Sequence, residues 1–221
     1  MADRLLFSKT GRARYISHLD LMRTFQRAFA RANIPIKHTE GFNPHPFVSI
    51  ALPLSVGYSS QCELLEFGLL DGTSYEEVPD RLTAAMPEGI LVHRCYPAER
   101  KLKELRYVNY IMTFEYPEGR PQETEPALAA LLSRESLVVK KKSNKAKAGF
   151  TEFDIIPLVR SWRIECQSDA MMADLVTSAQ NPGLNPDLIR AALCAEYPEY
   201  TPDLVTFHRR EVLDGEGKPF R

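Results

Sequence analysis

Apolar residues recur at the spacing of a helix between residues 17 and 33. At 100° per residue they fall in one sector, and three arginines fall opposite it. The apolar sector consists of Leu21, Met22, Phe25, Ala28, Phe29 and Ala32. The opposite row consists of Arg23, Arg27 and Arg31. This pattern predicts an amphipathic helix that packs its apolar side on a core and turns its arginines to water.

The segments around this helix alternate in type. Strand patterns cover residues 4–8, 47–52, 62–70 and 89–96, and a second helical pattern covers residues 75–86. The resulting order is strand, helix, strand, strand, helix, strand, which is the split βαβ arrangement of ferredoxin-like domains.

A similar order begins again after residues 98–106, a charged segment that we interpret as a linker. Strand patterns cover residues 108–116, 137–141, 150–156, 161–167 and 204–212, and helical patterns cover residues 125–134 and 185–196. Asn185 is the expected cap of the last helix, with Pro186 at its first position. Trp162 is expected in the core, and residues 168–184 fit no pattern.

We therefore predict an α+β protein with two ferredoxin-like (βαββαβ) units in tandem, each with an antiparallel sheet and helices on one face. The N-terminal unit would occupy residues 1–97, the linker residues 98–106, and the C-terminal unit residues 107–221. No sequence repeat relates the two halves, so this prediction rests on the order of elements alone.

The charge is unevenly distributed. The net charge of the chain is −1, but residues 1–50 contain eight Lys or Arg and three acidic residues, a balance of +5. This argues against indiscriminate binding of nucleic acid and favours one basic region near the start.

The four cysteines lack the close spacing of zinc or redox motifs, and we expect reduced, mostly buried thiols. The longest apolar stretches are too short to span a bilayer, and the first residues do not read as a secretory signal. We therefore expect a cytoplasmic protein.

The tetrapeptide SHLD, residues 17–20, contains the residue types of a hydrolase triad. A triad needs its members to converge from separate elements, however, whereas these residues open a helix. Ser17 and Asp20 instead have the spacing of a capping box, which leaves His18 available near a helix N-terminus.

The arginine row has the spacing that could follow a chain of phosphates, although a solvated helix face explains it equally simply. Further basic residues lie close by in sequence. The candidate phosphate-binding residues here are Lys9, Arg12, Arg14, Arg23, Arg27 and Arg31. A second basic run, KKKSNKAK, contributes Lys140, Lys141 and Lys142, with Lys145 and Lys147 behind them; it is either a loop kept in solution by charge or a phosphate-gripping loop.

The turn GFNPHP follows the arginine helix. Pro44 and Pro46 restrict their own backbone and push Asn43 and His45 toward extended conformations, so both side chains are presented with little freedom left to lose. We interpret His18, His38, Asn43 and His45 as recognition residues. The alternative is that the prolines merely end a strand. Phe42 is expected to pack in the core rather than to stack on a base.

Other chemistry has little support. A metal site of His18, His38 and His45 is conceivable but follows no spacing rule, and we assign no metal. Neither a GxxxxGK nor a GxGxxG motif is present, so no cofactor is expected, and no residue is assigned a catalytic role.

The block from Phe7 to Phe67, with SHLD, the arginine helix and GFNPHP, resembles the uncharacterised radical-SAM-linked protein family, and the resemblance continues more loosely to about Val212. It corresponds to the stand-alone form of that domain of unknown function. The resemblance implies a radical SAM partner protein but supplies no catalytic residue.

Three functions remain open. The leading hypothesis is a binding module that presents a structured RNA, such as transfer or ribosomal RNA, to the radical SAM partner. The second is a metal-independent RNA-cleaving enzyme that uses His18 or His45 as acid or base, by analogy with paired ferredoxin-like proteins that process CRISPR RNA. The third is an adaptor that binds the radical SAM protein without nucleic acid.

Overall fold

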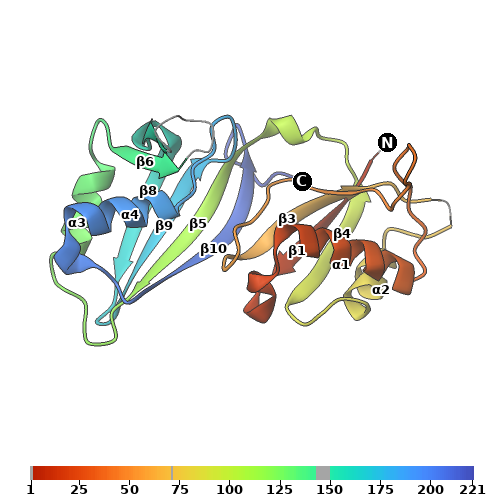
Figure 1. The fold of residues 1–221 in the computed structure, drawn as a ribbon, viewed down its shortest axis with the longest axis horizontal. Coiled ribbons are helices and arrows are strands. Elements are labelled where there is room, and N and C mark those ends of the chain that lie inside the picture. Colours follow the sequence, from red (N-terminus) through yellow and green to blue (C-terminus); the bar gives the residue numbers. More distant parts are fainter. Residues whose placement is uncertain (1, 71, 143–149) are drawn as a thin grey trace. The chain divides into compact units, whose positions relative to one another are not determined.

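The computed structural model describes residues 2–70, 72–142 and 150–221 and shows an α+β protein (Figure 1). The chain divides into two compact units. The first unit comprises Met1–Leu105 together with His208–Arg221, and the second comprises Arg106–Phe207. The prediction from the sequence differs, because it assigns all of residues 107–221 to the C-terminal unit.

The first unit is built from an antiparallel sheet and two helices. Its elements are β1 (Asp3–Lys9), the short 3-10 helix η1 (Gly11–Tyr15), α1 (His18–Arg31), β2 (Val48–Ile50), β3 (Ser59–Phe67), α2 (Val78–Ala84), β4 (Ile90–Pro97) and η2 (Leu102–Glu104). Strand β1 lies between β4 and β3, and β2 pairs with the outer side of β3 near its end. Strand β10 (Leu204–Asp214) adds a short parallel pairing at His208 and Arg209.

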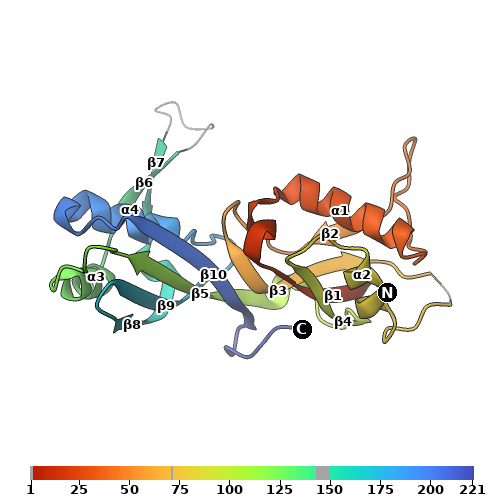
Figure 2. The same cartoon turned by 90° about the horizontal axis from the view of Figure 1, so that it is seen from below.

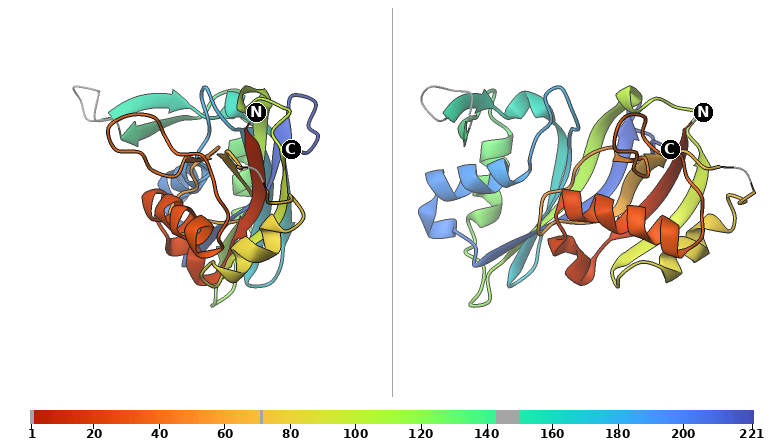
Figure 3. Two further views of the ribbon diagram at one scale, coloured as in Figure 1. Left: turned by 90° about the vertical axis from the view of Figure 1, so that its right-hand side faces the viewer. Right: turned by 45° about the vertical axis from the view of Figure 1, so that its right-hand side comes forward.

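Both helices pack on the same face of this sheet (Figure 3). The predicted apolar side of α1 is buried, and its Phe25 ring lies 4.7 Å from that of Phe7 on β1. The Phe29 ring lies 4.9 Å from that of Phe67 on β3. Each such aromatic side chain removes a large apolar area from water, which fixes α1 firmly on the sheet.

Part of the opposite face, around Arg4, is covered by the segment after β10. The Phe220 ring is fully buried, and the guanidinium groups of Arg4 and Arg100 lie 5.1 and 4.8 Å from its centroid. Arg4 is itself fully buried and bonds Glu66 at 2.6 Å. This contact explains why residues 208–221 belong to the first unit.

A second buried ion pair joins β3 to β10. Glu63 Oε1 lies 2.8 Å from Arg209 Nη1, and the two side chains are 1% and 5% exposed. The same arginine nitrogen donates to the Leu52 carbonyl at 2.8 Å. Cys62, beside this pair, is the one fully buried cysteine; the other three are half-buried, so the expectation of mostly buried thiols was too broad.

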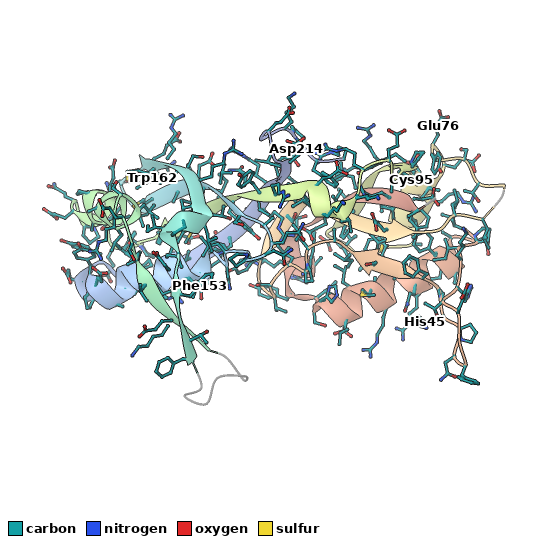
Figure 4. All side chains as sticks on the ribbon, turned by 90° about the horizontal axis from the view of Figure 1, so that it is seen from above. His45, Glu76, Cys95, Phe153, Trp162 and Asp214 are labelled. Atoms are coloured by element: carbon teal, nitrogen blue, oxygen red, sulfur yellow. The ribbon has the colours of Figure 1, made fainter. Side chains whose placement is uncertain are left out.

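The second unit contains β5 (Leu105–Glu115), α3 (Thr124–Leu132), β6 (Val138–Lys142), β7 (Phe150–Asp154), the 3-10 turn η3 (Ile156–Leu158), β8 (Val159–Cys166), β9 (Ala170–Ser178), α4 (Asp187–Glu196) and η4 (Pro198–Tyr200). Strand β9 lies between β5 and β8, and β6 and β7 form a separate antiparallel hairpin. Residues 168–184, which fitted no pattern, thus contain a central strand. Trp162 on β8 is 37% exposed, so its predicted place in the core was wrong (Figure 4).

Candidate nucleic-acid interface

The arginine row lies where the helical pattern placed it. Arg23, Arg27 and Arg31 are all exposed on α1, opposite its buried side. The helix begins as expected: the Ser17 hydroxyl accepts a bond from the Asp20 backbone N–H at 3.2 Å. In place of the second bond of a capping box, this hydroxyl donates to the Asp20 carboxylate at 2.7 Å. SHLD is therefore a helix cap.

Within the row, Arg23 and Arg27 are the arginines most available to a ligand. Arg23 Nη1 lies 3.1 Å from Asp20 Oδ1, but both side chains are more than 60% exposed, so water and salt weaken the pair. Hydrogen bonds from Ser17 and Arg23 lower the pKa of Asp20, which keeps it ionised. Arg27 makes no hydrogen bond or ion pair to any residue in the described part of the chain.

Arg31 has a structural partner. Its Nη2 donates to the Ala85 carbonyl at 2.6 Å, where α2 ends. In return, Arg81 on α2 donates to the carbonyls of Ala32 and Asn33 at 2.8 and 2.9 Å, where α1 ends. Each guanidinium satisfies carbonyls that the other helix leaves without an internal partner.

Lys9 does not belong to the surface. It is 1% exposed, and its ammonium donates to the carbonyls of Arg14 and Ile16 at 3.2 and 2.8 Å. Burial lowers its pKa, against the opposing charge of Glu63. Lys9 therefore fastens η1 to the end of β1 and cannot reach a phosphate. A lysine at a strand end reads as basic surface in a sequence, but here the following loop folds over it.

The two arginines of η1 lie nearer the surface. Arg12 is exposed, and Arg14 is half-buried. Arg14 Nη2 donates to the Tyr15 hydroxyl at 2.8 Å, and its guanidinium lies 4.9 Å from the centroid of that exposed ring. This pairing orients Arg14 and leaves Arg12 as the more accessible cation.

The residues 36–47, which we call the arm, form a narrow two-stranded loop. Its backbone is closed by bonds from Phe47 to Lys37 and from Thr39 to His45, each 2.8 Å, and by a bridge between His38 and Pro46. Gly41 in its tip has φ +121°, a conformation that L side chains rarely adopt. The GFNPHP sequence therefore builds a projecting, internally bonded arm.

His45 is held within the arm. Its Nδ1 lies 3.1 Å from the Thr39 hydroxyl and 3.2 Å from the Asn43 carbonyl, and its backbone N–H donates to the same hydroxyl at 3.2 Å (Figure 4). The ring is exposed, but the two contacts of Nδ1 restrict its orientation, and the backbone bond ties the residue to Thr39. Asn43 and His38 are also exposed, whereas His18 at the start of α1 is half-buried.

Phe42 occupies the tip of the arm and is 106% exposed. The expectation that it packs in the core was wrong, because the arm carries its tip away from the sheet. The arm is fastened to α1, however: Gln26 Nε2, three residues after Arg23, donates to the Pro46 carbonyl at 3.0 Å. An exposed aromatic ring and an arginine row therefore belong to one bonded substructure.

The lysine run lies in the other compact unit. Lys140, Lys141 and Lys142 belong to β6, and Lys140 is exposed with its ammonium 4.8 Å from the centroid of the Phe150 ring. Lys145 and Lys147 lie outside the described residues.

Among the residues described, no group of three or more His, Cys, Asp or Glu could hold a metal ion, so His18, His38 and His45 do not converge on one. Over the same residues no helix is long and apolar enough to cross a membrane.

Two features of this interface were not predicted from the sequence. The exposure of Phe42 could have been suspected from its neighbours, since Gly41, Asn43 and Pro44 leave no room for a strand or helix to bury it. The role of Arg31 could not, because its partner carbonyl lies 54 residues away.

The family described as "Uncharacterized protein conserved in bacteria (DUF2344)" matches residues 4–186. No curated protein matches the chain in sequence. Among solved structures, the chain is similar to one titled "Crystal Structure of a Cbf5-Nop10-Gar1 Complex", with 8% identity, a TM-score of 0.53, and coverage of 95% of this chain and 48% of that one. The chain thus spans about half the length of that protein, and the likeness concerns the fold alone.

A structure titled "Crystal Structure of an Unknown Protein from Galdieria sulphuraria" is 12% identical over 94% of this chain and 97% of that one, with a TM-score of 0.28.

Proposed function

This chain belongs to the DUF2344 family of uncharacterized bacterial proteins, and we propose that it is a binding module that presents a structured RNA to a radical SAM partner protein. The single observation that carries the proposal is the hydrogen bond that joins α1 to the arm, because it links a helix with exposed guanidinium groups to a loop with an exposed aromatic ring at its tip. The radical SAM partner is implied by the resemblance of the SHLD and GFNPHP segments. The cytoplasmic location that we propose rests instead on the short apolar stretches of the sequence.

The arginines would supply affinity that does not depend on sequence. Arg23 and Arg27 stand one helical turn apart on an exposed face, where they can neutralise successive phosphates. Arg12 is a third candidate. Arg31 is a weaker one, because a phosphate would compete with the Ala85 carbonyl for its guanidinium.

The arm would supply local recognition. A ring that protrudes on a rigid arm suits stacking on an unpaired base, and unpaired bases in loops and bulges are the usual targets of specific RNA recognition. Asn43 and His45 lie within three residues of Phe42 and carry polar groups that could bond a base edge. His18, at the start of α1, would lie toward the phosphates. A structured RNA with an exposed loop, such as transfer or ribosomal RNA, fits this arrangement.

The strand order within each unit supports the finer fold that we infer, two ferredoxin-like units. In the first unit β1 lies between β4 and β3, and in the second β9 lies between β5 and β8. Both are arrangements in which a strand pairs with a neighbour distant in sequence, as the split βαβ motif requires. The β6–β7 hairpin would then be an insertion in the second unit.

The proposal is tested by comparing two double variants that remove the same charge. Arg23→Gln with Arg27→Gln changes the proposed interface, and Arg160→Gln with Arg163→Gln changes exposed arginines of the second unit. Affinity for bulk bacterial transfer RNA and for ribosomal RNA fragments is measured over a range of salt concentrations. Two lost phosphate contacts should lower the slope of log K against log salt by about 1.5 in the first variant only.

Equal slopes in the wild type and in both variants would remove RNA from the account. If the slopes differ as expected, crosslinking of the protein to RNA in bacterial cells, with the same variants, would identify the RNA class.

The exposure of Phe42 also favours a second candidate, an adaptor that binds the radical SAM protein through the arm without nucleic acid, because solvent-exposed aromatic rings anchor protein interfaces. Co-purification with that protein after ribonuclease treatment and in high salt, lost in Phe42→Ala, would favour the adaptor. Loss of co-purification on ribonuclease treatment alone would favour the RNA module.

A further inference from the structure

The second unit contains a groove between α4 and the edge of the β6–β7 hairpin, with a volume of about 370 Å³. Its lining is mainly apolar. The lining residues are Leu137, Val138, Val139, Lys140, Leu188, Ala191, Ala192, Ala195 and Glu196. Figure 2 shows the hairpin extending beyond α4.

One wall of the groove is the edge of β6. Three consecutive residues of this strand and Leu137 just before it line the groove, and alternate side chains of a strand point to opposite faces, so the groove follows the edge rather than one face. Among the described residues β6 pairs with β7 alone. Leu137 accepts a bond from Ile155 on the β7 side, so the backbone groups of Val138 and Lys140 point away from β7 by the alternation of an antiparallel pair.

The other wall is the side of α4. Three alanines line it, and small side chains leave room for those of a ligand. Val138 is 56% exposed, so the wall opposite is a water-exposed apolar strand. A groove with an unpaired strand edge on one side and a helix on the other admits an extended chain, which can bond the strand and place alternate side chains against the helix.

The charged residues that line the groove indicate which extended chains it would bind. Glu196 at the helix side is paired with both terminal nitrogens of Arg134, so its charge is already balanced. Lys140 has no carboxylate partner among the described residues and lies over the Phe150 ring. Among the lining residues, the charge without an ion-pair partner in the described chain is therefore that of Lys140; Glu152, its register partner on β7, does not line the groove.

We propose that this groove binds an extended aliphatic segment of a partner protein, which adds a strand to β6 and places an acidic residue beside Lys140. The groove belongs to the second unit, whereas α1 and the arm belong to the first, and the proposal does not depend on the proposed RNA binding.

A second copy of the chain fits less well. Two β6 edges paired with each other would bring the VVKKK strands together and oppose their lysines, which destabilises a cross-strand pair. Lysines on an edge strand are a common device against self-pairing.

The test uses the full chain and dye-labelled synthetic peptides, followed by fluorescence anisotropy. The first peptide alternates Val and Thr and ends in Asp-Glu; the second ends in Lys-Lys, and the third has Ser in place of every Val. The first should bind at least about tenfold more tightly than either of the others. Its addition should slow hydrogen exchange at the amides of Val138 and Lys140.

Two variants test the walls of the groove. Ala195→Trp fills it and should weaken the first peptide at least about tenfold, whereas Ala130→Trp, an exposed alanine of α3 outside the lining, should leave the affinity unchanged. Lys140→Glu, an exposed change that leaves the packing intact, should reverse the preference between the acidic and basic peptides.

Absence of binding of all three peptides at about 1 mM would overturn the proposal. Equal affinity in Ala195→Trp, or an unchanged charge preference in Lys140→Glu, would also overturn it. A concentration-dependent dimer that Ala195→Trp dissociates would assign the groove to a second copy instead.

Discussion

Arg31 on α1 and Arg81 on α2 cap each other's helix: the guanidinium of each donates to backbone carbonyls at the C-terminal end of the other helix. Helix ends leave carbonyls without partners, and a cation there also interacts favourably with the helix dipole. The two arginines therefore hold α1 and α2 in register on the sheet. This reciprocal capping gives Arg31 a structural partner that Arg23 and Arg27 lack among the described residues, although all three form one row in the sequence.

Replacing Arg31 should thus cost stability, whereas replacing Arg27 should not. We expect Arg31→Ala to lower the free energy of unfolding by about 0.5–1.5 kcal/mol, since it removes one hydrogen bond from a charged donor. At about 2–4 °C per kcal/mol for a chain of this length, that loss corresponds to a fall in melting temperature of about 1–6 °C. Thermal unfolding followed by circular dichroism measures it, with Arg27→Ala as the control on the same helix. Equal melting temperatures for both variants would refute the capping role.

Phe42→Ala should change binding without changing stability. The side chain is 106% exposed, so its removal leaves no cavity and the melting temperature should stay within about 1 °C of the wild type. If the ring stacks on a base, RNA affinity should fall by about 1–3 kcal/mol. Phe42→Tyr retains an aromatic face and should restore the affinity. Full affinity in Phe42→Ala would exclude the arm tip from the interface.

Breaking the Glu63–Arg209 pair should destabilise the first unit strongly. Removing one partner leaves the other charge buried, which costs about 3–5 kcal/mol in buried pairs. We expect Arg209→Met to show this loss in urea unfolding. The double change Glu63→Leu with Arg209→Met should recover part of it, because neither member of the pair is then left charged and alone, although the buried Lys9 loses the nearby charge of Glu63. A double variant less stable than the single one would show that these residues act independently.

The thiol of Cys62 should make stability depend on pH above about 9. Burial raises its pKa from 9.0 to about 12, whereas the unfolded chain has the ordinary pKa. Between these values the unfolded state loses a proton that the folded state keeps, so the free energy of unfolding falls as pH rises, by about 1.4 kcal/mol per pH unit for one thiol. Urea unfolding of wild type and Cys62→Ala at pH 8, 9 and 10 tests this. Cys62→Ala should show a smaller decline, and parallel curves would contradict the expectation.

The elements that the sequence predicted best are those with a long periodic pattern. The buried side of α1 follows from Leu21, Phe25 and Phe29 alone, because a helix of this length repeats its period several times. The strand predicted at residues 47–52 shortened to Val48–Ile50, since Phe47 belongs to the arm and only two positions are buried. Short apolar runs fix the presence of a strand better than its ends.

The central strand β9 was missed for a related reason. Its alternation is present, with Met171, Ala173 and Leu175 buried, but Met and Ala are poor indicators of a strand and Asp174 interrupts the apolar residues. In the structure the side chain of Asn109 on β5 donates to Asp174. A partner from a distant strand makes this acid acceptable, and no local pattern can reveal such a partner.

Within the candidate interface, the sequence predicted residue types better than their surroundings. Arg23, Arg27 and His45 are exposed as the patterns indicated. Lys9 was grouped with the phosphate-binding residues because it lies near the arginine row in sequence, yet its ammonium donates to two carbonyls of the loop that follows it. Its burial depends on how η1 folds back, which is a tertiary property.

The grouping of His208–Arg221 with Met1–Leu105 also sets an order for synthesis on the ribosome. A nascent chain that has reached only Leu105 contains Glu63 without Arg209, and Arg4 and Arg100 without the ring of Phe220 that both contact. These groups must wait while all of Arg106–Phe207 is translated. The first unit therefore begins to be translated first but is completed last, and the second unit can fold before it.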